Sequence, residues 1–469
     1  MAQLLVSAAH KSSGKTTVSV GLVAALRGQG RRVQPFKKGP DYIDPLWLGR
    51  AAGRPCHNLD FHTQGPDEIR ATFARHAAGA DLAVIEANKG LHDGMDLEGG
   101  DSNAALARLL QAPVVLVIDT RGMTRGVAPL VLGFAAFDPR VRIGGVILNQ
   151  VGGSRHEGKL RAVLERYTDI PVLGAVRRDP ALHIDERHLG LIPSNEHADT
   201  ARHIDLIRRR ILDQVDLEAV QALAASAPAI VPPHVETPAA AAGEPVRIGV
   251  LRDAAFGFYY AGDLDAFADC GAELVFIDSL RDTRLPPVDG LFLGGGFPET
   301  HMETLAANRE LMADIRRAIE AGLPTYAECG GLMYLARSLH WGERRCEMAG
   351  VIPGDVVMGE RPQGRGYTVL EETGHLPWPR LDAPEGPVHA HEFHYSRMEN
   401  LAPDATFAWR VLRGAGVDGR HDGIVYRNLV AGYAHLRHTR QCPWVRRFTG
   451  FVRALRRSRS EPPSRQAGP

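Results

Sequence analysis

The sequence predicts an α/β protein with two α/β domains. The chain has 469 residues, which is more than one hydrophobic core usually serves. In the N-terminal half, short apolar runs alternate with helix-length stretches, and this alternation is typical of a parallel sheet wrapped by helices. Residues 226–245 are rich in Pro and Ala and lack any helical or strand period. The sequence therefore predicts domains at 1–225 and 246–450, a linker at 226–245 and a basic, disordered tail at 451–469.

The charge balance and the cysteines limit the class of protein. Lys plus Arg number 55 and Asp plus Glu number 55, so no net field favours nucleic acid or an anionic membrane as the partner, and a small-molecule enzyme fits better. The 5 cysteines are odd in number and widely scattered, unlike those of a zinc site or a disulfide scaffold. We therefore expect a soluble protein in a reducing cytoplasm. The sequence contains no run of about 18 apolar residues, which a membrane-spanning helix would need.

The N-terminal half follows a strand, loop, helix order. A strand is predicted at 3–7 and a helix with apolar residues at helical spacing at 17–26. Further elements share the same alternation: strands at 82–85, 114–118 and 143–148, and a helix at 103–110.

The loop Ala8–Thr17 joins that first strand to its helix and contains Gly-Lys-Thr. Backbone N–H groups and a helix N-terminus in this position can hold a phosphate. Lys15 would reach the outer phosphates of ATP and Thr16 would bind Mg²⁺. Ala9 replaces the first glycine of the usual pattern, and a plain Gly and Ser turn is the alternative. The context favours nucleotide binding by four residues: Gly14, Lys15, Thr16 and Thr17.

Acidic residues follow the strand at 82–85. Glu86 ends this strand and Asp93 comes shortly after it, at the sheet edge where α/β sites gather. Either residue could hold Mg²⁺ or orient a carboxylate substrate, and Glu86 would hold the metal together with Thr16. The alternative is that each is only a helix cap or a turn residue. The loop Phe36–Pro45 combines cations and carboxylates, which suits an anionic substrate beside a metal nucleotide, or else an ordinary solvated loop.

The C-terminal half begins a second set of elements. Strands are predicted at 246–251, 274–277 and 290–293, and a helix at 264–270. Later in this half, Cys329 stands between a strand end and two glycines that open a helix, which is the layout of a nucleophile elbow. A helix dipole and a nearby His would lower the pKa of this thiol and favour attack on a glutamine side-chain amide. The alternative is an inert buried cysteine.

The partners of Cys329 come from two other segments. His435 follows a strand-like stretch near the end of the domain and is the predicted base, with His438 as the fallback. Gly295 and Gly296 lie in a Gly-rich strand end whose amides could form an oxyanion hole. A flexible Gly turn is the alternative for this segment.

Together these residues make the chain resemble the cobyrinic acid a,c-diamide synthase family, over about residues 1–450. In that family a dethiobiotin-synthetase-like domain is fused to a class I (Triad-type) glutamine amidotransferase domain. The motifs that carry the resemblance are Ser12–Thr17, Phe36–Pro45, Gly90–Gly94, Ile118–Met123, Glu186–Leu191, Gly294–Glu299, Glu328–Gly331, His391–Ser396 and the segment around His435.

The resemblance implies a reaction and its residues. ATP would phosphorylate a peripheral acetate of a tetrapyrrole, and ammonia released from L-glutamine at Cys329 would travel internally and displace the phosphate. His435 would activate Cys329, in a dyad that lacks the third acidic member of related enzymes. By matched position, four residues would lie near Mg²⁺, nucleotide or substrate carboxylate: Asp41, Tyr42, Glu86 and Asp93. A homodimer is one option for the assembly.

Three residues depart from the pattern of corrin-specific members: Lys38, Asn88 and Lys89. Added cations beside the substrate acetate would favour a more anionic ring. The macrocycle is therefore left open: the first expectation is a cobyrinic acid-like corrin precursor, from the family resemblance, and the second is siroheme or a sirohydrochlorin. Two other readings are a P-loop ATPase that has no use for Cys329, and a synthetase acting on a non-tetrapyrrole acid.

Overall fold

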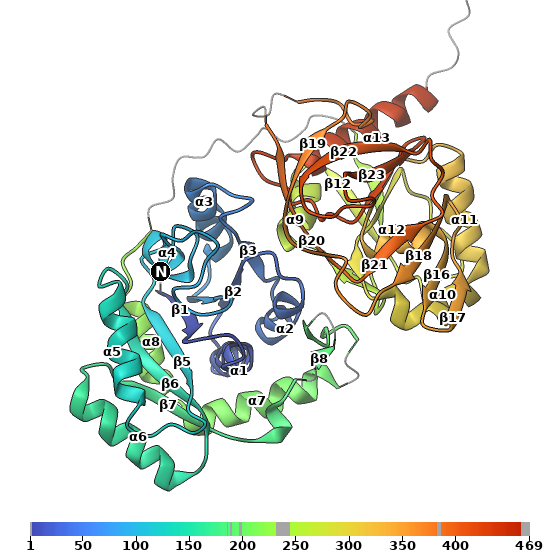
Figure 1. Ribbon diagram of the computed structural model, residues 1–469. Coiled ribbons are helices and arrows are strands. Elements are labelled where there is room, and N and C mark those ends of the chain that lie inside the picture. The colour runs from blue at the N-terminus through green and yellow to red at the C-terminus, as the bar shows by residue number, and fades with distance from the viewer. Residues whose placement is uncertain are drawn as a thin grey trace, which may run out of the picture. The chain divides into compact units, whose positions relative to one another are not determined.

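The chain divides into two compact units, Met1–Glu236 and Thr237–Pro469 (Figure 1). The structure is a computed structural model that describes residues 2–184, 186–187, 190–196, 199–230, 244–381 and 386–460. The division falls inside the predicted linker, of which residues 231–243 lie outside the described part. No helix among the described residues is long and apolar enough to cross a membrane.

Unit 1 is built on a seven-stranded sheet in which all neighbouring strands are parallel. In spatial order the strands are β3 His57–Leu59, β2 Val33–Lys38, β4 Leu82–Glu86, β1 Ala2–Ala8, β5 Val114–Asp119, β6 Ile143–Val151 and β7 Val172–Arg177. A separate ribbon pairs β8 Glu186–Arg187 with β9 Gly190–Leu191, and His188 and Leu189 of this predicted motif lie outside the described residues. The strands predicted at 3–7, 82–85, 114–118 and 143–148 are confirmed.

Helices cover both faces of this sheet, as its buried strands require. Leu4 and Val6 of β1 point to one apolar core and Leu5 points to the other, in the period of two that strands impose. The helices on the first face are α1 Lys15–Gly28, α2 Ile43–Ala52, α7 Thr200–Gln214 and α8 Leu217–Ala225. Those on the second face are α3 Pro66–Ala77, α4 Asn103–Leu109, α5 Val127–Phe137 and α6 Ser154–Tyr167, and a 3₁₀ turn, η1, spans Pro180–Leu182.

Unit 2 is built on a nine-stranded sheet that is only partly parallel. The parallel strands are β12 Ala272–Ile277, β10 Val246–Leu251, β13 Gly290–Leu293, β15 Thr325–Glu328 and β24 Leu429–Gly432. The sheet continues, with antiparallel pairing, through β23 His421–Tyr426, β22 Thr406–Arg413, β19 Gly364–Glu372 and β20 Val388–His394. The sequence signals found the parallel part only, because antiparallel strands need no crossover helix between them.

Two smaller sheets and several helices complete unit 2. A four-stranded sheet contains β17 Arg344–Glu347, β16 Ala336–Trp341, β18 Ile352–Met358 and β21 Ser396–Glu399, and a ribbon pairs β11 Phe256–Phe258 with β14 Gly295–Gly296. The helices are α9 Ala261–Asp269, η2 Pro298–His301, α10 Met302–Ala307, α11 Arg309–Glu320, α12 Gly330–Leu335 and α13 Trp444–Ser460.

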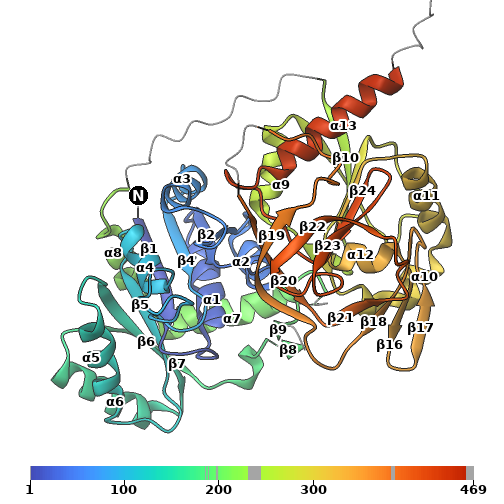
Figure 2. The ribbon, with the colours of Figure 1, turned by 45° about the horizontal axis from the view of Figure 1, so that its top comes forward.

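The last helix corrects the prediction of a disordered tail from residue 451. Residues 451–460 belong to α13, which lies beside α9 and β10 (Figure 2). Phe448 and Val452 are buried at helical spacing, and Arg453 donates hydrogen bonds to the carbonyls of Glu244 and Cys270. The apolar residues of this Arg-rich segment share one face, which is enough to dock the helix. Residues 461–469 lie outside the described part.

The packing of α13 predicts that Phe448→Ala destabilises the protein. Phe448 is 0% exposed, and truncation of a buried Phe costs about 3–5 kcal/mol. Urea unfolding followed by fluorescence measures this loss. Arg457→Ala, on the exposed side of the same helix, is the control and should change the stability by about 0.5 kcal/mol or less. Equal unfolding midpoints for the two variants would contradict the docking of α13.

Candidate active sites

Asn149 of β6 contacts the loop between β1 and α1 and fixes its conformation. Gly14 caps α1 with φ +84°, and a Cβ at this position would lie 2.1 Å from Nδ2 of Asn149. The same Asn149 amide donates to the carbonyl of Ser13 over 2.9 Å. Lys15 is the first residue of α1 and is buried, which lowers the pKa of its ammonium group. Only glycine fits the turn, and Thr17 follows in the first turn of the helix.

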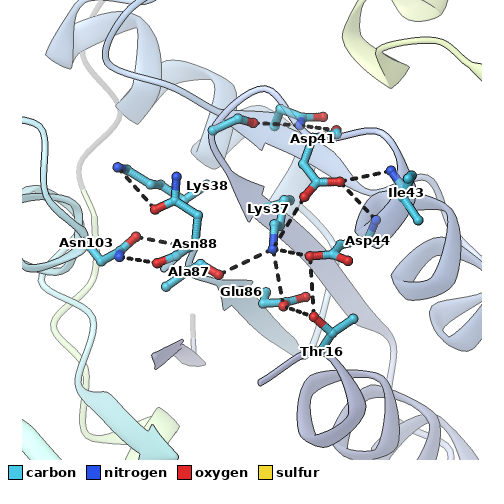
Figure 3. A network of polar contacts seen from close by, with 12 residues as sticks. Thr16, Lys37, Lys38, Asp41, Ile43, Asp44, Glu86, Ala87, Asn88 and Asn103 are labelled. Atoms are coloured by element: carbon cyan, nitrogen blue, oxygen red, sulfur yellow. Dashed lines mark hydrogen bonds and ion pairs between the residues drawn. The ribbon is translucent and has the colours of Figure 1, made fainter. Parts of the chain in front are cut away.

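Three carboxylates surround Lys37 next to this loop, and we call them the acidic cluster: Asp41, Asp44 and Glu86 (Figure 3). Nζ of Lys37 lies 2.5 Å from Oδ2 of Asp44, 3.2 Å from Oε1 of Glu86 and 3.9 Å from Oδ2 of Asp41. The hydroxyl of Thr16 donates to Glu86 over 2.7 Å and lies 3.4 Å from Asp44. The structure thus places three of the predicted site residues, Thr16, Glu86 and Asp41, in one polar network.

Sequence reasoning did not select Lys37 or Asp44 as site residues. Lys37 lies directly across from Glu86 in the β2–β4 pairing. The two residues are far apart in the sequence, so the sequence alone does not reveal their contact. Asp44 stands in the first turn of α2, with its backbone amide bonded to the Asp41 carboxylate. A carboxylate in the first turn of a helix is a recognisable sequence feature, and it could have identified Asp44 as a candidate site residue. For Lys37, the only such feature was the density of charged residues in Phe36–Pro45.

Burial controls the charges of this cluster. Burial alone would lower the pKa of Lys37, but the neighbouring carboxylates outweigh it and raise the pKa above its ordinary value. Burial, and then the charge of Asp44, raise the pKa of Asp41 to about 7, and burial also raises the pKa of Glu86. Oε2 of Glu86 is buried and has no hydrogen-bond partner among the described residues. An oxygen-rich set with surplus negative charge and an unsatisfied oxygen fits Mg²⁺.

Two other predicted residues lie near the cluster in different settings. Asp93 is exposed, and its carboxylate accepts the amide of Gly90 over 2.9 Å. A Cβ on Gly90 would lie 2.7 Å from the carbonyl oxygen of Ala9, so this turn lies against the phosphate loop. Tyr42 is 8% exposed at the N-terminal cap of α2. The turn of Asp93 is thus close to the phosphate loop, whereas Tyr42 begins the helix that carries Asp44.

The three departures from the family pattern have different environments. Lys38 is buried, and its ammonium group donates to the carbonyl of Asp101 over 2.6 Å and lies 3.5 Å from Oδ1 of Asn88 (Figure 3). The carboxylate of Asp101 in turn accepts the amides of Met95 and Asp96. Lys38 therefore stabilises the turn at 94–101 through its hydrogen bond to Asp101. Lys89 is exposed, with φ +40°.

In unit 2, Cys329 occupies a strained turn between β15 and α12. Its φ is +46° and its ψ is −99°, a combination that costs a non-glycine residue about 1–3 kcal/mol. The glycines after it allow the close approach of a second segment. A Cβ on Gly331 would lie 2.3 Å from the carbonyl oxygen of Leu293, and one on Gly330 would lie 3.0 Å from the amide nitrogen of Gly296. These contacts fit the predicted nucleophile elbow.

The predicted base lies at the same edge of the sheet. Strand β24 runs parallel to β15, with Gly432 across from Glu328, and the amide of Cys329 donates to the carbonyl of Gly432 over 2.8 Å. His435 follows β24, and a Cβ on Gly295 would lie 2.6 Å from Cε1 of His435. Four predicted residues are thus assembled beside one another: Cys329, His435, Gly295 and Gly296. The fallback His438 is not among them, because its ring accepts the amide of Val445 at the start of α13.

A carboxylate stands where the resemblance implied none. Oε2 of Glu328 lies 3.2 Å from Nδ1 of His435, and both side chains are 3% exposed. Oε1 of Glu328 accepts the hydroxyl of Tyr326 over 2.7 Å and the amide of Leu436 over 2.9 Å. The expectation of a dyad without an acidic neighbour is therefore wrong for this chain. The pairing of β15 with β24 creates the contact, and the sequence alone does not reveal that pairing.

The charges of this second site also differ from expectation. Burial, and then the carboxylate of Glu299, raise the pKa of Cys329, so the predicted lowering of that pKa is wrong for this structure. Burial lowers the pKa of His435 to about 3 and raises that of Glu328 to about 8, with the hydrogen bond from Tyr326 opposing the second shift. The imidazole is therefore neutral, and one of its ring nitrogens carries a lone pair.

Comparisons with known proteins divide the chain in the same way. Residues 5–192 match a CobQ/CobB/MinD/ParA nucleotide binding domain, and residues 247–441 match a CobB/CobQ-like glutamine amidotransferase domain. A cobyrinate a,c-diamide synthase of Magnetococcus marinus is 49% identical, covering 92% of this chain and 93% of its own length. Synthases of the same name from Methanosarcina acetivorans (92% of each chain) and Archaeoglobus fulgidus (95% and 96%) are each 40% identical.

The elbow geometry predicts that Gly331→Ala removes ammonia release from glutamine. The added methyl group would press on the backbone of Leu293, which cannot move without β13. We expect a roughly 100-fold lower rate, the scale on which a displacement of about 1 Å acts. Gly262→Ala in α9 is the matched control, because no atom lies within 4 Å of that position. Equal rates for the two variants would contradict this geometry.

Proposed function

The chain belongs to the cobyrinate a,c-diamide synthase family, and from this we propose that it amidates the a and c acetates of a cobyrinic acid-like ring, using ATP and glutamine. The observation that carries the proposal is that one chain holds both a phosphate loop beside an acidic cluster and a cysteine elbow beside a neutral histidine. A P-loop ATPase without a glutaminase would have no use for the second site.

The first reaction activates the acetate. A carboxylate is a poor electrophile, so one of its oxygens attacks the γ-phosphorus of ATP, giving an acyl phosphate and ADP. Lys15 and the amides at the N-terminus of α1 bind the phosphates, and Lys37 neutralises charge beside them. Mg²⁺, when bound, supplies further neutralisation of the phosphate charge, and three oxygen ligands would hold it: Thr16, Asp44 and Glu86. Asp93, Asp41 and Tyr42 would orient the substrate.

The second reaction supplies ammonia. The thiol proton of Cys329 moves to Nε2 of His435, and the sulfur attacks the side-chain carbonyl carbon of glutamine. Amides of the Gly295–Gly296 segment would stabilise the oxyanion. The C–N bond breaks, the leaving nitrogen takes the proton from His435, and water then hydrolyses the glutamyl thioester to glutamate. Ammonia attacks the acyl phosphate, phosphate leaves, and loss of a proton gives the amide.

A siroheme-type ring is the second candidate substrate. The exposed Lys89 beside the turn of Asp93 favours it, because an extra ammonium group there suits an additional or displaced carboxylate. Lys38 favours it less directly, because its charge is engaged by the carbonyl of Asp101. A cytoplasmic location and a homodimeric assembly remain predictions from the sequence.

Mass spectrometry of parallel reactions with cobyrinic acid, hydrogenobyrinic acid and siroheme tests the proposal. The expected product carries two amides and forms only when ATP, a divalent cation and a nitrogen source, either glutamine or ammonium chloride, are present together. Removal of the cation with EDTA should stop amidation. If none of the three rings is amidated, a synthetase for a non-tetrapyrrole acid becomes the better explanation.

The two chemistries should separate by mutation. Lys15→Ala should abolish amidation and leave basal glutaminase activity, because Lys15 and Cys329 belong to different units. Cys329→Ala should abolish glutaminase activity and leave amidation driven by ammonium chloride. Ammonia release and product mass are the two readouts. Loss of both activities in either folded variant would rule out this separation.

The role of Lys89 predicts a change in substrate preference. Lys89→Met removes one charge-assisted contact, which is worth about 1.5–3 kcal/mol, so kcat/KM should fall roughly tenfold or more for the preferred ring only. Lys159→Met, an exposed lysine on α6, is the control and should leave all rates unchanged. An equal, small effect of both variants on every ring would show that Lys89 does not select the substrate.

A further inference from the structure

Glu328 is tied to its surroundings through both carboxylate oxygens. Oε1 accepts two donors, the Tyr326 hydroxyl at 2.7 Å and the Leu436 amide at 2.9 Å. Oε2 faces Nδ1 of His435 at 3.2 Å. The side chain is 3% exposed, so water does not compete for these oxygens. A buried carboxylate with this many protein contacts has one orientation.

This arrangement gives the two nitrogens of His435 different neighbours. Nδ1 points to Oε2 of Glu328, whereas Nε2 would lie 3.4 Å from a Cβ built on Gly295, in the segment that borders the elbow. In its ionised form, which predominates at pH values above its pKa of about 8, the Glu328 carboxylate only accepts hydrogen bonds, so it requires the proton of the neutral imidazole to stay on Nδ1. The lone pair is then on Nε2, the nitrogen that faces the Gly295–Gly296 segment next to the elbow.

Other buried carboxylates near His435 are engaged differently. Asp422 accepts the amides of Tyr433 and Ala434, both at 2.9 Å. Glu392 accepts the amides of Ala415 and Gly416 and lies 3.6 Å from Nε2 of His394. These two residues support loops and a second histidine, whereas Glu328 meets the ring of the base itself.

We propose that Glu328 is a positioning residue of the glutaminase site, which holds His435 in the tautomer that accepts the Cys329 proton and stabilises the imidazolium that forms. This inference rests on the proposed function of unit 2. As the proton moves from sulfur to Nε2, the ring becomes cationic beside Oε2, and the opposite charge favours the ionised carboxylate. The acid is supplied by the residue just before the nucleophile, so one four-residue strand, β15, orients both the thiol and its base.

The experiment compares Glu328→Gln with the wild-type chain. The Gln oxygen can keep accepting from Tyr326 and Leu436, but its NH₂ would donate to Nδ1 and place the imidazole proton on Nε2, the wrong nitrogen. We expect kcat for glutamine hydrolysis to fall by at least about 100-fold with little change in KM, because tautomer loss acts on the chemical step. Amidation driven by ammonium chloride should be unchanged. Tyr326→Phe, which removes a donor from the same carboxylate without touching His435, should stay within about tenfold of wild type.

A double-mutant cycle shows whether Glu328 acts through His435. In a His435→Ala background, adding Glu328→Gln should cause no further loss, because the ring that it orients is gone. A merely structural residue would lower the rate again in that background. Full additivity of the two losses would overturn the proposal, and so would wild-type kcat in Glu328→Gln.

Two further outcomes keep the inference separate from the function beneath it. If the wild-type chain releases no ammonia from glutamine, the proposed function of unit 2 fails, whatever the variants do. If Glu328→Gln also loses ammonia-driven amidation, the variant is misfolded, and Glu328→Asp decides instead, because it keeps the charge. Recovery of glutaminase activity in Glu328→Asp relative to Gln would support the proposal, and equal loss in both would overturn it.

Discussion

The structure depends on charged groups held out of water at the carboxyl ends of parallel strands. A buried charge is costly unless it has a partner and hydrogen bonds. In unit 1, Lys37 meets this requirement through Asp44, Glu86 and Asp41. In unit 2, Glu328 meets it through two donors and a histidine. Both sites therefore exist only when the strands that carry these groups are paired in the correct order, so that folding and site assembly are one event within each unit.

Local sequence patterns predicted the parallel elements and selected most of the candidate site residues. The phosphate loop and the cysteine elbow are signalled by short segments in which glycine, lysine or cysteine stands at a strand-to-helix turn. Lys37 and Glu328 were harder to identify because their roles come from strands adjacent in space: β2 with β4, and β15 with β24. The antiparallel part of unit 2 was missed for a related reason, since hairpin-connected strands give no helix-length spacing. The helix at 451–460 was missed because its composition concealed its apolar face.

Desolvation explains why the Cys329 thiol differs from expectation. A helix start and a nearby histidine favour a thiolate, but burial and the carboxylate of Glu299 oppose it more strongly. A thiol that stays protonated until glutamine arrives is protected from oxidation and from other electrophiles. The neutral state of His435 complements this, because the base is ready to accept a proton and need not lose one first.

The segment that carries His435 is fixed by its backbone as well as by its ring. Asp422 accepts the amides of Tyr433 and Ala434, Glu328 accepts that of Leu436, and Asp263 accepts that of His438, while the amide of His435 itself goes to the carbonyl of His391. Each accepting oxygen is matched to one amide of this segment. The segment therefore has a fixed length: a single inserted or deleted residue would shift every amide away from its acceptor and leave buried carboxylates unsatisfied. A substitution, unlike an insertion or a deletion, leaves these backbone hydrogen bonds in register.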